Sequence, residues 1–213
     1  VHQQVFGYEQ AFLDRKASVS VRLPYSQLVS PGFFNDTGLG DLTVVTKYVL
    51  AEDRETGNLL STGLLLTLPT GNRDFGSTIA GEEFASVLIQ PFLGYIVQRD
   101  RAFAQGFTTV VVPTDSDDVT LFTSDLQLGY QLYQNPGGFL SSFIPTVEGH
   151  LNIPLNKRGA STDPVGFPDQ FTALGGAQFI FRDRFLVGTA VGAPLTGPRP
   201  FSLQATVQLN YFF

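Results

Sequence analysis

Residues 201–213 read Phe-Ser-Leu-Gln-Ala-Thr-Val-Gln-Leu-Asn-Tyr-Phe-Phe. Every second position, from Phe201 to Phe213, is apolar, and the positions between them are mostly polar. Successive side chains of a strand point to opposite faces, so this segment is predicted to be a strand with one apolar and one polar face. Such a strand at the free edge of a soluble sheet promotes aggregation. A closed membrane barrel has no free edge and turns its apolar face to lipid, so the segment favours a membrane barrel.

The composition points the same way. Of the 213 residues, 43% are hydrophobic and 15% are charged, against about a quarter charged in a typical soluble domain. No stretch approaches the about 18 consecutive apolar residues of a transmembrane helix, because alternation places the apolar residues at every second position. The absence of cysteine excludes disulfides and thiolate sites, and a net charge of −6 argues against nucleic acid as a partner. We expect a single domain over residues 1–213, without a cofactor.

The same alternation recurs along the chain and predicts ten further strands. They cover residues 6–13, 17–25, 42–50, 60–68, 87–97, 103–112, 126–132, 139–153, 171–181 and 185–193. Helical periodicity never extends beyond a turn or two. The predicted fold is all-β: a transmembrane antiparallel up-and-down β-barrel of about twelve strands in a bacterial outer membrane. A soluble β-sandwich is the alternative fold.

The predicted connections alternate between two classes. The short, charged or turn-like ones cover residues 14–16, 52–57, 99–101, 135–138 and 182–184, and the longer loops with Pro and Gly cover residues 29–40, 69–84, 113–118, 154–169 and 196–200. Outer-membrane barrels have short periplasmic turns and longer extracellular loops, so the C-terminus is expected in the periplasm. Aromatic residues near the short-turn ends are expected to form a membrane girdle. They are Phe12, Tyr48, Tyr95, Phe103, Tyr211 and Phe213.

The strand count is odd. Eleven strands would put the two chain ends on opposite sides of the membrane, whereas bacterial single-chain barrels have even strand numbers. We therefore expect a further strand before Val1. The alternative is that one of the weaker predicted strands is really two strands, or none. The sequence starts at Val1 with neither Met nor a signal peptide, which indicates a processed or trimmed chain.

Six short motifs follow one another from residue 38 onward. They are Gly-Leu-Gly-Asp-Leu at 38–42, Lys-Tyr at 47–48, Leu-Thr-Leu-Pro-Thr-Gly at 66–71, Gln-Pro-Phe-Leu-Gly-Tyr at 90–95, Leu-Gly-Tyr at 128–130 and Pro-Leu-Thr-Gly-Pro-Arg-Pro-Phe at 194–201. In this order they resemble a family of Gram-negative outer-membrane proteins labelled "MetA-pathway of phenol degradation" or "transporter". The resemblance implies a barrel that passes small, often aromatic, compounds, and it supplies no catalytic residues. The C-terminal Phe, with Tyr two positions earlier, also resembles the terminal signature of outer-membrane barrels, which implies recognition of the last strand by the barrel-assembly machinery.

Functional side chains are expected on the inward face, because lipid-facing residues can do little but anchor the barrel. The candidates on the predicted parity are Glu9, Arg22, Lys47, Phe92, Asp125, Glu148, His150 and Asn152. Glu9 and Arg22 lie across the first hairpin and could pair inside the barrel. Either they neutralise each other in a wet lumen, or Arg22, Lys47 and Glu148 line a constriction that filters solutes by charge.

The inward face is also unusually apolar for a porin. Its apolar residues are Val45, Val49, Leu65, Leu88, Phe92, Ile96, Leu140, Ile144, Leu174 and Ile180. They either form a track for hydrophobic solutes or pack as a core without a pore. A β-bulge would move part of this set to the other face. The sequence therefore predicts passive uptake of small apolar or aromatic solutes, with a filled-lumen structural or surface-interaction barrel as the alternative.

One cluster has the composition of a catalytic site. Glu148, His150 and Asn152 are two residues apart and share a face, so they are expected to form a polar network. An outer-membrane phospholipase of twelve strands also uses His, Ser and Asn, but its Ser lies two positions after the His and its groups face lipid. Here Asn152 occupies that position and the cluster faces inward. We therefore expect neither an enzyme nor, at the acidic loop 115–118, a metal site.

Overall fold

The computed structural model describes residues 2–30, 34–72, 86–157, 169–196, 199 and 201–212. This part of the chain is all-β and forms one antiparallel up-and-down sheet of thirteen strands. None of its residues belongs to a helix long and apolar enough to cross a membrane. The all-β, up-and-down fold predicted from the alternation is therefore confirmed.

Eleven strands follow one another along the sheet, and each overlaps one predicted strand. They are β1 (His2–Phe12), β2 (Ala17–Ser30), β4 (Leu42–Asp53), β5 (Asn58–Leu68), β6 (Leu88–Arg99), β7 (Ala102–Pro113), β8 (Leu121–Tyr130), β10 (Leu140–Pro154), β11 (Gln170–Phe181), β12 (Phe185–Pro194) and β13 (Gln204–Tyr211). Most of them reach the about 9–11 residues that a tilted strand needs to cross a bilayer.

Two short strands were not predicted. β3 (Phe34–Leu39) pairs with the end of β2, and β9 (Tyr133–Gln134) pairs with β10. The prediction of one loop over residues 29–40 was wrong, because β2 continues to Ser30 and β3 folds back along it. The sequence Phe-Asn-Asp-Thr-Gly-Leu of β3 has low intrinsic strand propensity. Its pairing depends on the neighbouring edge of β2, which single-sequence patterning does not reveal.

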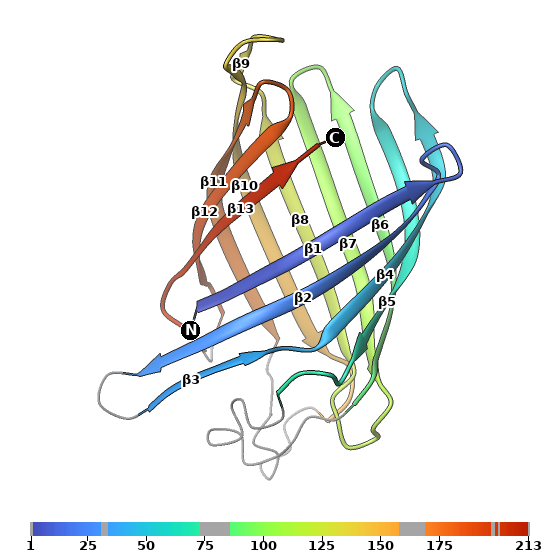
Figure 1. Ribbon diagram of the computed structural model, residues 1–213, viewed down its shortest axis with the longest axis vertical. Helices are drawn as coiled ribbons and strands as arrows, with labels where there is room; N and C mark the ends of the chain where they lie inside the picture. Colours follow the sequence, from blue (N-terminus) through green and yellow to red (C-terminus); the bar gives the residue numbers. More distant parts are fainter. Residues whose placement is uncertain are drawn as a thin grey trace.

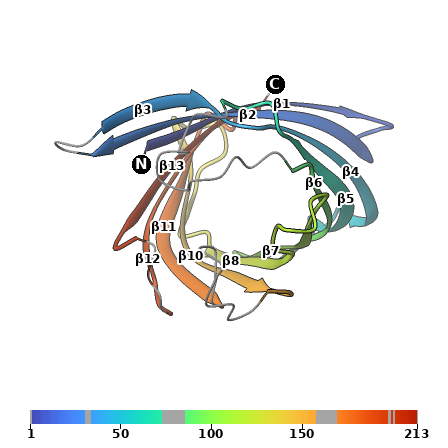
Figure 2. The same ribbon diagram turned by 90° about the horizontal axis from the view of Figure 1, so that it is seen from below.

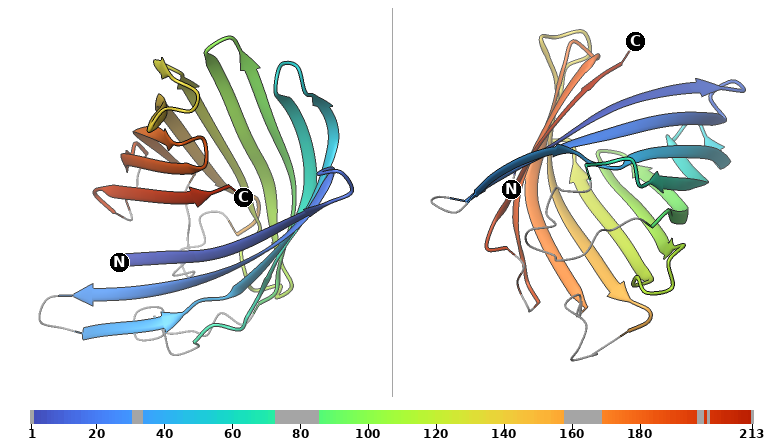
Figure 3. Two further views of the ribbon diagram at one scale, coloured as in Figure 1. Left: turned by 45° about the horizontal axis from the view of Figure 1, so that its top comes forward. Right: turned by 60° about the horizontal axis from the view of Figure 1, so that its bottom comes forward.

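The sheet curls into a barrel-like shape but its ladder does not close (Figures 1 and 2). Within the described ranges, β1 pairs only with β2, and β13 pairs only with β12, so these two strands are the edges of the sheet (Figure 3). As the first and eleventh members of an up-and-down path, β1 and β13 run in the same direction. An antiparallel ladder therefore cannot join them, and the closure expected of a barrel is not seen.

The strand ends that border the short connections and those that border the long connections lie at opposite ends of the sheet, as predicted (Figure 1). The β1–β2 turn is closed by a hydrogen bond from Lys16 N to Leu13 O of 3.0 Å, and three of its residues have positive φ. The described C-terminal residues lie at this short-turn end, where Phe212 N donates to Arg184 O. β1 starts at the other end of the sheet. The alternation of loop classes thus identified the two ends of the sheet.

The two faces of the sheet differ in exposure. Side chains on the concave face, called the inner face below, include Val45, Phe92 and Leu174, which are 2%, 6% and 5% exposed. Side chains on the convex, outer face include many large apolar residues, such as Val191 at 52% and Val207 at 69%. The apolar residues that were predicted to face inward lie on the inner face, with one exception. Leu140 is the exception, because a bulge before Ser142 pairs it with Phe181, on the opposite face from Ile180.

Candidate functional site on the inner face

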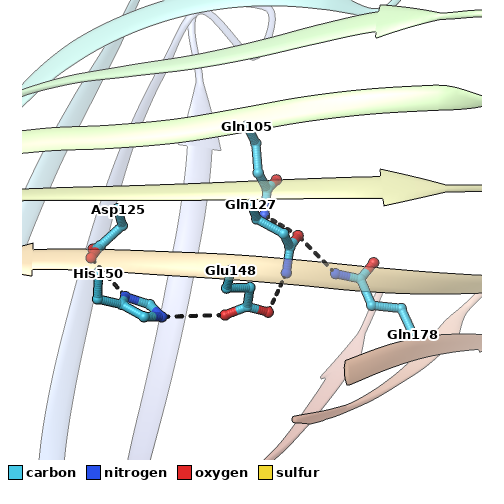
Figure 4. Close-up of polar contacts among 6 residues, drawn as sticks. All are labelled: Gln105, Asp125, Gln127, Glu148, His150 and Gln178. Atoms are coloured by element: carbon cyan, nitrogen blue, oxygen red, sulfur yellow. Dashed lines mark hydrogen bonds and ion pairs between the residues drawn. The ribbon is translucent and has the colours of Figure 1, made fainter. Parts of the chain in front are cut away.

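A continuous strip of six polar side chains crosses four neighbouring strands on the inner face (Figure 4). We call it the polar strip; its members are Gln105 on β7, Asp125 and Gln127 on β8, Glu148 and His150 on β10, and Gln178 on β11. The strand register explains why they meet. His150 is the direct cross-strand partner of Asp125, Glu148 is the partner of Gln127, and Gln127 is the partner of Gln105.

The histidine lies between two carboxylates. His150 Nδ1 is 2.7 Å from Asp125 Oδ1, and His150 Nε2 is 3.5 Å from Glu148 Oε2. The side chains of His150, Asp125 and Glu148 are 34%, 45% and 21% exposed, so this part of the strip is open to water. When His150 is neutral, the two carboxylates leave this part of the inner face negatively charged.

Gln127 connects the charged groups to the rest of the strip. Its Nε2 donates to Glu148 Oε1, while its Oε1 accepts hydrogen bonds from Gln105 at 2.7 Å and Gln178 at 3.2 Å (Figure 4). Each amide therefore donates in the direction of the carboxylate. The arrangement fixes the orientation of all three glutamines and presents a row of hydrogen-bonding groups to the inner side of the sheet.

The predicted Glu148–His150–Asn152 network is present only in part. Glu148 and His150 interact, but Asn152 pairs with Thr123 and Gln170 and contributes no side chain to the strip. Among the described residues, no serine hydroxyl hydrogen-bonds to His150, and no group of three or more His, Asp and Glu is arranged to hold a metal ion. The strip is an array for hydrogen bonding and charge rather than a recognisable nucleophile–base pair.

The glutamines of the strip were missed by the sequence analysis. A glutamine on the polar face of a strand occurs in many places in this chain, and only the register shows which ones adjoin Glu148. The cross-strand pairs Glu148–Gln127 and Gln127–Gln105 would have identified two of the three glutamines. The alternation predicts the face of each residue but not its neighbour on the next strand.

A second polar cluster lies where β1, β2 and β4 adjoin. Lys47 Nζ is 2.7 Å from Glu9 Oε1, and the Ser18 hydroxyl donates to the same oxygen at 2.6 Å. The predicted Glu9–Arg22 pair was wrong. Arg22 stands opposite Gly7, two positions from the level of Glu9, and it forms no ion pair with the residues described. Lys47 reaches Glu9 across the small side chains of β2.

The remaining inner-face candidates are on the predicted face. Lys47, Asp125, Glu148 and His150 take part in the contacts above, and Arg22 and Asn152 share that face by register. Phe92 also faces inward, but it is packed rather than free. Its ring lies 5.0 Å from the ring of Phe107, and a Cβ built on Gly63 would meet it at 2.5 Å.

The predicted aromatic girdle is only partly placed as expected. Phe12, Tyr48, Tyr95 and Tyr211 lie on the outer face near the short turns, with exposed fractions between 37% and 53%. Phe103 shares the inner face with Gln105, and its ring lies against Gly129, so it does not belong to an outward-facing girdle. Phe103 was correctly predicted to lie near a short turn, but the alternation within β7 places its side chain on the inner face. Phe213 lies outside the described residues.

No protein-family model matches this chain, and no curated protein matches its sequence significantly.

Proposed function

We propose that this chain is an outer-membrane channel for passive uptake of small apolar or aromatic solutes. The observation that carries the proposal is the division between the two faces. The outer face presents large apolar side chains, such as Leu128 at 51% and Leu209 at 63% exposure, whereas the inner face carries the polar strip. Exposing a large apolar side chain to water forgoes about 1.5–3 kcal/mol relative to burial, so lipid is the favourable environment for this surface.

The ends of the sheet support an orientation. In outer-membrane barrels the short turns face the periplasm and the long connections face outward, so the end of β13 would lie in the periplasm. The tyrosines Tyr48, Tyr95 and Tyr211 then lie at the periplasmic lipid interface, where the hydroxyl meets water and the ring meets lipid. The terminal signature makes β13 the segment that the barrel-assembly machinery would recognise.

The solute class follows from the inner face. Apolar side chains adjoin the partly exposed row of amides and carboxylates. Leu174 is the cross-strand partner of Glu148, and Phe92 packs against Phe107, the cross-strand partner of Asp125. Such a surface offers contact for an apolar ring together with hydrogen bonds for one or two polar substituents. The resemblance to the transporter family named above supports the same class of solute.

A filled-lumen barrel with a structural or surface-interaction role is the second candidate. The low exposure of Val45, Phe92 and Leu174 favours it, because these side chains pack against their neighbours instead of standing free. The two candidates share the membrane location and differ only in whether a solute can pass.

Reconstitution into liposomes separates the two candidates. The purified chain, refolded in detergent and inserted into vesicles, should admit a small aromatic alcohol faster than protein-free vesicles do, and should give discrete single-channel currents. Protein that floats with the vesicles and resists extraction but leaves flux at the protein-free level would support the filled-lumen barrel. Protein that does not float with the vesicles would exclude both candidates.

A further inference from the structure

A groove with a volume of about 580 Å³ lies on the outer face near the short-turn end, over β7. It is formed by two adjacent rows of cross-strand neighbours. One row contains Val97, Ala104, Leu128 and Val147, and the next contains Arg99, Ala102 and Tyr130. The groove lies on the opposite face from the polar strip, so the proposed solute path does not use it.

The groove exists because small residues alternate with large ones across the sheet. Ala102 and Ala104 form its floor, while Val97 on β6 and Leu128 on β8 form walls that are both 51% exposed. Further along β7 the floor continues to Gly106, over which the ring of Tyr95 lies. The groove is therefore closed at the end nearer the middle of β7 and open toward the β6–β7 turn.

The open end of the groove carries a cation. Arg99 lines it, and within the described part of the chain the guanidinium has no hydrogen bond or ion pair. The adjoining turn contains Asp100 and a second arginine, Arg101, so the local charge is positive. Tyr130 stands across Ala102 from Arg99 and is 48% exposed. The groove thus combines an apolar trough with a positive charge and a phenol at one end.

We infer that this groove binds an anionic phospholipid, with one acyl chain along Ala102 and Ala104 and its phosphate at Arg99. The inference rests on the proposed membrane location of the outer face. An acyl chain matches the apolar walls, and a phosphate supplies the counter-charge that Arg99 lacks; arginine also binds phosphate through paired N–H groups. A wholly apolar ligand would leave the guanidinium without a partner. The lipid would come from the leaflet at the short-turn end.

Tryptophan fluorescence can test this directly, because the chain contains no tryptophan. A single reporter, Val147→Trp, is placed at the groove wall, and Val191→Trp serves as the control on the outer face of β12, where the exposure is similar. Each protein is inserted into phosphatidylcholine vesicles containing a small fraction of brominated phosphatidylglycerol or brominated phosphatidylcholine. Quenching by each brominated lipid measures how often that lipid occupies the site.

The expected result is a preference for phosphatidylglycerol at Val147→Trp that is absent at Val191→Trp. Replacing Arg99→Gln should reduce the preference about fivefold, the effect of one cation near a membrane surface. Arg184→Gln, in the β11–β12 turn at the same end, is the matched control and should leave it unchanged. Ala104→Phe should fill the trough and lower quenching by both lipids at Val147→Trp, whereas Ala205→Phe, on the outer face of β13, should not.

Equal preference at the two reporters would overturn the inference, as would a preference at Val147→Trp that survives Arg99→Gln. If phosphatidylcholine quenched Val147→Trp as strongly as phosphatidylglycerol does, the groove would make only ordinary, unselective lipid contacts. Solute flux is measured on the same vesicles. Inserted, conducting protein without lipid preference contradicts only the lipid site, whereas protein that does not insert contradicts the proposed function.

Discussion

Lys47 Nζ lies 2.7 Å from Glu9 Oε1, although β2 separates the strands that carry the two residues. The contact passes over Ser18, whose hydroxyl also donates to Glu9. It therefore ties the edge strand β1 to the third strand along the sheet, in addition to the ladder between β1 and β2. Because the two side chains are 33% and 44% exposed, solvent screens their attraction.

The first prediction concerns the Lys47–Glu9 ion pair. Glu9→Gln should lower the free energy of unfolding by about 0.5–1 kcal/mol at low salt and by less at high salt, because the pair is partly exposed. Hydrogen exchange should accelerate at the amides of β1 and remain unchanged in β7 and β8. The exchanged pair Glu9→Lys with Lys47→Glu should restore most of the loss. Equal acceleration in all strands would show that Glu9 acts on global stability rather than on the edge.

The second prediction concerns the polar strip. Asp125→Asn and His150→Gln should each destabilise the protein, and the double variant should lose less than the sum, with a coupling of about 0.5–1.5 kcal/mol. The reason is that the two side chains are 2.7 Å apart and directly opposite in the ladder. Denaturant unfolding in detergent measures all four proteins. Additive losses would mean that the contact contributes no net stability.

The third prediction uses two glycines as a matched pair. A Cβ on Gly63 would meet the carbonyl oxygen of Thr46 and, at 2.5 Å, the ring of Phe92, whereas a Cβ on Gly175 would meet nothing within 4 Å. Gly63→Ala should therefore cost about 1–3 kcal/mol of stability, and Gly175→Ala should change it by less than about 0.5 kcal/mol. The midpoint of denaturant unfolding reports both. Similar midpoints for the two variants would contradict the packing described around Phe92.

The fourth prediction concerns Arg22, a charged inner-face residue without an ion pair in the described part of the sheet. If solutes pass along this face, Arg22→Glu should shift the reversal potential of a planar bilayer under a salt gradient toward cation selectivity. Arg15→Glu, in the β1–β2 turn, makes the same charge change outside the inner face and should shift it much less. Unchanged selectivity in Arg22→Glu would remove this residue from the pathway.

The strand pattern was predictable because each strand carries its own signal. In β6, Ile89, Leu93 and Tyr95 alternate with the less exposed Gln90 and Phe92, so the face of each residue can be read without its neighbours. β3 could not be found in this way, because its strand propensity is low and its structure depends on the edge of β2. The sequence also predicted an odd number of strands along the sheet. This odd number explains why the two edge strands, β1 and β13, run in the same direction.

The contacts of the site were less predictable. Glu9 was expected to pair within its hairpin with Arg22, yet it reaches over β2 to Lys47. Glu148 was expected to interact with His150 and Asn152, yet it interacts with His150 and with Gln127 on the neighbouring strand. In both cases the sequence gives the face but not the register, and a shift of two positions along a strand changes the partner while leaving the face unchanged.

We propose that solutes pass along a wet inner face and that lipid covers the outer face. Because the chain has no cysteine, single cysteines report on each face without background. Gln178→Cys and Ala177→Cys are adjacent on β11 and point to opposite faces. In vesicles, a charged, membrane-impermeant thiol reagent should modify Gln178→Cys and reduce the single-channel current, while Ala177→Cys should react only after unfolding. Equal modification of both cysteines, or modification of Ala177→Cys alone, would show that the inner face is not the water-accessible one.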